Sequence, residues 1–307
     1  MLQQTQVTTV LPYYLRFVAA LPDVRALAAA TLDQVLALWS GLGYYRRAHH
    51  LHAAACEVIT HHGGRFPSDA ATLATLPGIG RSTAAAIAAF ASGERGAILD
   101  GNVKRVLARH DAIEGYPRSP AVEAKLWKAA ERRLPPDDVE AYTQGMMDLG
   151  ATICVKRAPR CDRCPVAGDC VARRERRTHE LPSPRPAKAL PHKAVRVLVI
   201  ERGGELLLEK RAPVGIWAGL WSLPELPLDR DVTAFIDERF GARARIVGDL
   251  EPIEHGFTHF ALTLHPRRVA ITGWPARAEA PQWIWLPREE ALGAALPAPI
   301  RRLLQAL

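Results

Sequence analysis

The chain has 307 residues, which is enough for two domains that each bury a core. Its composition is typical of globular proteins, and no apolar run approaches the roughly 18 residues of a membrane-spanning helix. A formal net charge of +8 favours an anionic partner, of which nucleic acid is the commonest. Because the first residues lack the basic start and apolar stretch of a signal peptide, we expect a cytoplasmic protein.

Helical spacing of apolar residues dominates the first half of the chain. The capping-box spacing of Thr31 and Gln34 predicts a helix that ends at Gly41. No alternating strand pattern occurs before residue 190. Further helices are predicted at 45–59, on both sides of 77–80, and at about 102–110, 121–133 and 138–153.

A change in composition separates the two halves. Residues 171–193 are rich in arginine and proline, cannot pack a core, and are predicted to form an extended linker. Beyond them, alternation from Val195 to Val199 and further strand patterns from 245 to 286 accompany helices near 231–240 and 298–306. The sequence therefore predicts an all-α part over 1–170, a linker over 171–193 and an α+β part over 194–307.

Residues 76–84, LPGIGRSTA, have the pattern of a helix-hairpin-helix element. Gly78 and Gly80 permit a tight turn that leaves backbone N–H groups free at the start of the next helix. Such donors suit a DNA phosphate, and they bind the DNA backbone without recognising its base sequence. An ordinary turn between two helices uses the same residues, so the pattern alone does not establish DNA binding.

Asp100 follows Ser82 by eighteen residues, in the segment ILDGNVKR. An aspartate just before a helix is usually an N-cap. A helix N-terminus also suits a carboxylate that must face a developing positive charge. Beside a DNA-binding hairpin, the second interpretation is favoured.

Four of the five cysteines crowd into residues 154–170 with the spacing C-x6-C-x2-C-x5-C. Four thiolates at this spacing suit a [4Fe–4S] cluster or a structural zinc ion, and spacing alone does not choose between them. Disulfides fit a cytoplasmic protein poorly. The predicted ligands are Cys154, Cys161, Cys164 and Cys170, and the basic residues interleaved with them are those expected of a loop that also faces phosphates.

Hairpin, aspartate and cysteine spacing together resemble the endonuclease III superfamily of DNA glycosylases. Four segments narrow the resemblance to its MutY-type adenine glycosylases: MLQQTQV (1–7), GLGYY (41–45), LDGNVKRVLAR (99–109) and MMDLGATIC (146–154). The resemblance implies a helix-hairpin-helix glycosylase core with a [4Fe–4S] loop, followed by a Nudix-like α+β domain. It also implies a monomer that acts on double-stranded DNA and removes adenine mispaired with 8-oxoguanine or guanine.

The same resemblance assigns roles to residues of the helical half. Asp100 matches the residue that stabilises the oxocarbenium-like sugar, and Asn102 one that organises the same pocket. Ser82 stands where strand-cleaving relatives carry a nucleophilic lysine, so we expect a monofunctional enzyme. Gln4 and Tyr44 match residues that insert beside 8-oxoguanine after adenine is flipped out. Judged from the residues alone, Gln4 would be a solvated helix residue and Tyr44 a half-buried core tyrosine.

The second half resembles the Nudix-like domain of this family, which recognises 8-oxoguanine. The matching segments are residues 215–221 (GIWAGLW) and Phe257-Thr258-His259. Simple core packing is the alternative for Trp217 and Phe257. No run with the paired glutamates of a Nudix hydrolase follows residues 223–225, so pyrophosphate hydrolysis is not expected.

One family residue has no counterpart here. In the family a glutamate three residues before the methionine of MLQQT helps adenine to leave as a neutral group. In this chain that methionine is Met1. We expect the start to have been assigned to an internal methionine of a longer, active glycosylase. The alternative is a lesion-binding protein of impaired activity that recognises the mispair without cleaving it.

Overall fold

The structure is a computed structural model that describes residues 1–186, 189–275 and 280–307. Residues 187–188 of the predicted linker and 276–279 of the predicted strand region lie outside the described residues. The chain folds into two compact units. The helical unit comprises residues 57–188, and the mixed unit comprises residues 1–56 together with 189–307. In the part of the chain that is described, no helix is long and apolar enough to cross a membrane.

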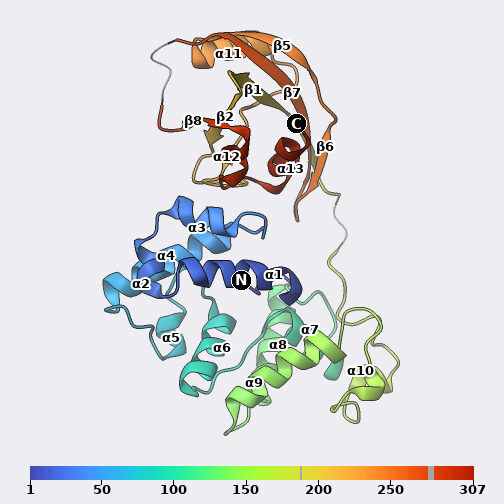
Figure 1. Cartoon of the computed structure of the whole chain (residues 1–307). Coiled ribbons are helices and arrows are strands. Elements are labelled where there is room, and N and C mark those ends of the chain that lie inside the picture. Colours follow the sequence, from blue (N-terminus) through green and yellow to red (C-terminus); the bar gives the residue numbers. More distant parts are fainter. Residues whose placement is uncertain (187–188, 276–279) are drawn as a thin grey trace. The chain divides into compact units, whose positions relative to one another are not determined.

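The helical unit is built around α7, whose inner face is apolar. Val103 and Leu107 of α7 pack with Leu126 and Ala129 of α8 in one buried cluster. Figure 1 shows α6 to α9 gathered around this core. In chain order the elements are the end of α4 (Arg46–His61), α5 (Ala70–Leu73), α6 (Arg81–Ser92), α7 (Gly101–His110), α8 (Pro120–Arg132), α9 (Val139–Asp148), the π-helix η1 (Leu149–Ile153), the 3-10 turn η2 (Cys161–Arg163) and α10 (Val171–Arg174).

Part of the segment with linker composition is packed on the helical unit. Leu181 is buried, and its carbonyl accepts a hydrogen bond from Arg109 Nε at 2.8 Å. Ser183 Oγ accepts another from the backbone N–H of Gly115 at 3.1 Å. The chain passes from one compact unit to the other after residues 56 and 188. The boundaries at 170 and 194, which were drawn from composition, stay a prediction.

The mixed unit contains a mixed sheet with the strand order β3-β2-β1-β7-β5. β1 runs parallel to β7, and the other pairings along this path are antiparallel. The bounds are β1 (His192–Arg202), β2 (Glu205–Lys210), β3 (Trp221–Ser222), β4 (Glu225–Leu226), α11 (Val232–Phe240), β5 (Arg243–Asp249), β6 (Ile253–Gly256), β7 (Ala261–Gly273), β8 (Trp283–Pro287), α12 (Arg288–Gly293) and α13 (Ala298–Ala306). The predicted fold class, an all-α part followed by an α+β part, is confirmed.

Alternation along β1 divides the core of the mixed unit into two layers. Leu198 and Ile200 join the cluster that contains α11. Val197 and Val199 join the other cluster, which also holds residues of α12 and α13 and of the N-terminal helices α1 (Val7–Ala20) and α3 (Leu32–Trp39). Figure 1 shows α3 on the side of the sheet that carries α12 and α13. Together with α2 (Val24–Ala29), these helices therefore pack with the sheet, an arrangement that the periodicity of the sequence does not reveal.

Candidate DNA-binding and base-excision site

The hairpin between α5 and α6 leaves helix donors without a side-chain cap. Gly78 has a φ of +78°, which favours glycine, and Gly80 is the N-cap residue of α6. Among the residues that the structure describes, no side chain caps α6 and a Cβ at Gly80 would meet no atom within 4 Å. The first N–H groups of α6 are therefore open to an external acceptor, which fits the predicted phosphate contact.

Asp100 is the N-cap of α7. Its Oδ1 accepts hydrogen bonds from the backbone N–H groups of Asn102 at 2.9 Å and Val103 at 2.8 Å. The residue is exposed, and within the described parts of the chain no hydrogen bond to Oδ2 is found. The two interpretations of Asp100 are therefore compatible, because the cap uses one oxygen and the other stays open to a ligand.

Ser82 links the hairpin to the segment that precedes Asp100. Its Oγ accepts a hydrogen bond from the backbone N–H of Leu99 at 2.8 Å. Leu99 is buried, so this contact fixes the chain immediately before the carboxylate. The position that could carry a nucleophilic amine in a lyase carries a hydroxyl with a structural contact here.

Arg105 joins the N-terminal half of α7 to η1 and the cysteine that follows it. Its Nε donates to the carbonyl of Cys154 at 2.7 Å, and its Nη2 donates to Asn102 Oδ1 at 2.9 Å and to the carbonyl of Gly150 at 2.6 Å. Burial lowers the pKa of Arg105 from its usual value. Asn102 is thereby held by the same guanidinium as the first cysteine of the predicted metal loop. Arg105 was not among the residues predicted from the sequence.

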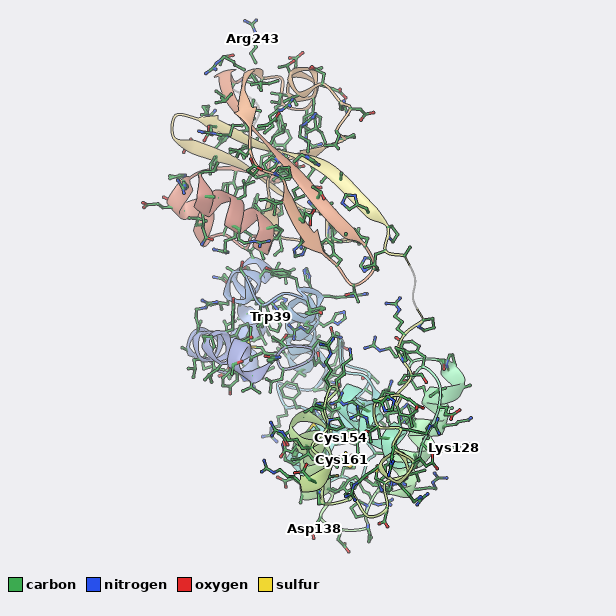
Figure 2. All side chains as sticks on the ribbon, turned by 90° about the vertical axis from the view of Figure 1, so that its right-hand side faces the viewer. Trp39, Lys128, Asp138, Cys154, Cys161 and Arg243 are labelled. Atoms are coloured by element: carbon green, nitrogen blue, oxygen red, sulfur yellow. The ribbon has the colours of Figure 1, made fainter. Side chains whose placement is uncertain are left out.

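The four cysteines of the predicted metal loop line one cavity, together with Arg109 and residues of η1. Arg109 Nη1 lies 3.4 Å from Cys154 Sγ and donates to the carbonyl of Val155 at 2.7 Å. Figure 2 shows Cys154 and Cys161 near each other. Burial and the neighbouring thiols raise the pKa of Cys161. Among the described residues, no group of three or more His, Cys, Asp or Glu side chains is found that could hold a metal ion.

Gln4 and Tyr44 both lie in the mixed unit, in left-handed backbone conformations. Their φ angles are +62° and +49°, which costs a non-glycine residue about 1–3 kcal/mol. Tyr44 is 54% exposed, whereas the next residue, Tyr45, is buried. The core interpretation of Tyr44 is therefore wrong. Gln4 is exposed as expected, although it precedes α1 rather than lying within a helix.

Phe257 anchors the turn that carries Thr258 and His259. The backbone N–H of Phe257 donates to the carbonyl of Phe260 at 2.8 Å, and the two rings stack with centroids 4.5 Å apart. Trp217 is buried against Phe257, so core packing describes its position well. Thr258 and His259 are exposed at the tip of the turn. Phe257 thus supports the turn, while Thr258 is exposed and His259, also exposed, packs edge-on against the ring of Phe260.

Comparisons with known proteins agree with both halves of the fold. Residues 1–132 match the HhH-GPD superfamily base excision DNA repair proteins, and residues 196–306 match the NUDIX domain. The chain is therefore a base excision repair protein in which a helix-hairpin-helix glycosylase fold precedes a Nudix-like domain. A solved thermostable thymine-DNA glycosylase aligns with 57% of this chain and 80% of its own, at 28% identity and a TM-score of 0.51.

Similar curated proteins show to which family of base excision repair proteins the chain belongs. The adenine DNA glycosylase of Buchnera aphidicola subsp. Acyrthosiphon pisum is 33% identical over 99% of this chain and 87% of its own length. The human adenine DNA glycosylase is 33% identical over 99% of this chain and 66% of its own length. The chain belongs to the adenine DNA glycosylase family, so it is a DNA N-glycosylase of base excision repair. The predicted resemblance is confirmed, and the alternative of a binder without activity is not favoured.

Proposed function

We propose that this glycosylase removes adenine paired with 8-oxoguanine or guanine in double-stranded DNA and leaves the sugar–phosphate strand intact. The observation that carries this proposal is the Asp100 carboxylate, held at the N-terminus of α7 by two backbone N–H groups with one oxygen open. As the N-glycosidic bond of a flipped-out deoxyadenosine breaks, positive charge develops on the sugar. A preorganised carboxylate beside it stabilises the transition state more than the neutral substrate.

The hydroxyl of Ser82 supports a monofunctional reaction. A lyase needs an amine that attacks the sugar and forms a Schiff base. Ser82 has no amine, and its oxygen accepts a hydrogen bond from Leu99 N–H. Water is therefore the proposed nucleophile that attacks the sugar once adenine leaves. The enzyme would act as a monomer on chromosomal DNA, at the nucleoid in the cytoplasm.

Two surface elements of the mixed unit would recognise the mispair. Gln4 and Tyr44 are exposed on strained backbone, and a planar amide or ring can insert between bases and recover stacking. Thr258 and His259 are exposed on the Phe257 turn and present polar atoms that could distinguish 8-oxoguanine from guanine. Gly78, Gly80 and Ser82 would hold the backbone of the same DNA.

Thr258→Ala is expected to lower the preference for 8-oxoguanine over guanine opposite adenine by about 3- to 10-fold, the value of one neutral hydrogen bond. The measurement is single-turnover excision on both duplexes, with their affinities. Thr272→Ala, at an exposed threonine of β7, is the matched control and should leave the ratio unchanged. An equal loss on the two duplexes would show that Thr258 has only a structural role.

The donor set at the cysteine loop fits a [4Fe–4S] cluster. Four thiols line one cavity, and Arg109 Nη1 lies within hydrogen-bond distance of Cys154 Sγ, at 3.4 Å. Cys154, Cys161, Cys164 and Cys170 would hold the cluster, which would fix the loop and its interleaved basic side chains against DNA phosphates. The cluster would have a structural role, and the proposed chemistry of base excision rests on the Asp100 carboxylate.

The purified protein is expected to contain about four iron atoms and four sulfides, with visible absorbance. Cys164→Ser should lose most of the iron and the absorbance, because a serine hydroxyl is a poor substitute for a thiolate ligand. Cys56→Ser, in the other unit, should keep both. Stoichiometric zinc without sulfide would contradict the cluster.

A further inference from the structure

Arg47, in the first turn of α4, connects two segments that lie about forty residues apart in the chain. Its Nη1 donates to the carbonyls of Met1, at 2.6 Å, and of Gln3. Its Nη2 donates to Thr5 Oγ1 at 3.0 Å and to the carbonyl of Gly43 at 3.2 Å. One guanidinium thus holds both the 1–5 segment and the 41–45 segment.

Two of these carbonyls directly precede Gln4 and Tyr44, which have left-handed backbone conformations. The carbonyl of Gln3 shares a peptide plane with the nitrogen of Gln4, and the carbonyl of Gly43 does so with that of Tyr44. Fixing a peptide plane restricts the φ angle of the residue that follows it. Arg47 therefore constrains the backbone at Gln4 and Tyr44, two residues that combine positive φ with an exposed side chain.

The same guanidinium lies between two aromatic rings. Its Cζ is 5.4 Å from the ring centroid of Tyr44 and 5.3 Å from that of Trp39. Trp39 is only 1% exposed, and its Nε1 donates to the carbonyl of Gly43 at 3.1 Å. Figure 2 shows Trp39 within the N-terminal helices of the mixed unit. Arg47 therefore contacts the Tyr44 ring from a position fixed by Trp39 and four hydrogen bonds, while Tyr44 as a residue remains 54% exposed.

We propose that Arg47 is a positioning residue that holds Gln4 and Tyr44 as one preformed wedge for the mispair. This inference rests on the proposed function, in which both side chains contact DNA. A guanidinium suits the role because its planar fork donates in several fixed directions and also stacks on a ring. Lysine retains the charge but offers a single ammonium group, which cannot reach all four acceptors in the same geometry.

The test compares Arg47→Lys with Arg46→Lys, a matched control at the exposed neighbouring arginine. Equilibrium affinities are measured on a DNA duplex with 8-oxoguanine opposite a non-hydrolysable 2′-deoxyadenosine analogue, and on an undamaged duplex. We expect Arg47→Lys to lose about 10-fold or more in affinity for the lesion duplex, because charge-assisted hydrogen bonds are lost, and to bind undamaged DNA as before. Arg46→Lys should match the parent on both duplexes.

A double-mutant cycle separates positioning from a direct contact. In the background of Gln4→Ala with Tyr44→Ala, the further change Arg47→Lys should cost no additional lesion affinity. A full, additive loss there would overturn the inference and leave the proposed roles of Gln4 and Tyr44 standing. If Gln4→Ala and Tyr44→Ala themselves leave lesion binding unchanged, the proposed function fails at these residues and the inference fails with it.

Thermal unfolding of each variant monitors the fold. Should Arg47→Lys fail to fold, Thr5→Ala removes one acceptor while keeping the arginine. It is expected to lower lesion affinity about 3-fold, near the lower end for one intramolecular hydrogen bond, and to leave affinity for undamaged DNA unchanged. An equal loss on both duplexes, or none on either, would contradict the positioning role.

Discussion

Asp100→Asn is expected to reduce the single-turnover rate of adenine excision by about 10²- to 10³-fold, the scale of one preorganised electrostatic contact to the transition state. Asparagine has nearly the same shape as aspartate and is an equally good N-cap. Its side-chain oxygen can still accept from the N–H groups of Asn102 and Val103. The substitution therefore removes the charge and preserves the helix start, so affinity for the 8-oxoguanine:adenine duplex and thermal stability should stay near those of the parent.

The excision assay is read with and without alkali, because a monofunctional enzyme breaks no strand until the abasic product is treated. Asp23→Asn is the matched control, since Asp23 caps α2 through the backbone N–H of Ala26 at 2.8 Å. That variant should excise adenine at the parental rate. Asp100→Ala, which also loses the cap, should in addition lose about 1 kcal/mol of unfolding free energy. Near-parental excision by Asp100→Asn would remove the catalytic role from this residue.

The helices and the change to strands could be predicted because they depend on local patterns. The predicted helix at 298–306 coincides with α13, and the predicted 231–240 differs from α11 by one residue at its start. The cap at Asp100 was also predictable, because N-capping needs only neighbouring residues. These features required no knowledge of which elements meet in space.

Tertiary packing explains what the sequence could not provide. Leu36 and Trp39 have the same helical spacing whether they pack on other helices or on a sheet, so their burial with Val197 could not be foreseen. The wrong core interpretation of Tyr44 has a similar origin. Tyr45 begins the predicted helix at 45–59, whereas Tyr44 precedes it, so the helical periodicity gives no information about the Tyr44 ring. Arg47, between Tyr44 and the first residues, carries no local signal of its own.

The π-helix η1 was also missed, because a five-residue bulge at the end of α9 has no sequence pattern distinct from an α-helix. It places Gly150 against the first turn of α7. A Cβ built at Gly150 would lie 2.6 Å from Asn102 Cβ and 3.1 Å from the backbone atoms Cα and C of Asn102. Glycine is therefore required here for close approach of two backbones, and Arg105 then joins Gly150, Asn102 and Cys154.

Gly150→Ala is accordingly expected to destabilise the protein by at least about 1–3 kcal/mol, because backbone atoms cannot move aside as a flexible side chain can. Excision should fall as well, since relief of the clash displaces Asn102 and the adjoining Asp100. Gly145→Ala provides a control of opposite sign. Gly145 lies inside α9, where a Cβ would meet no atom within 4 Å, so alanine should stabilise the helix by roughly 0.5–1 kcal/mol.

Chemical denaturation measures the two variants side by side, with excision assayed on the same preparations. The opposite signs are informative because both changes add one methyl group to a glycine within the same few residues. A general intolerance of bulk near the end of α9 would destabilise both variants. Parental stability in Gly150→Ala would instead mean that η1 and α7 do not approach as closely as described, and the link from Cys154 through Arg105 to Asn102 would lose its structural basis.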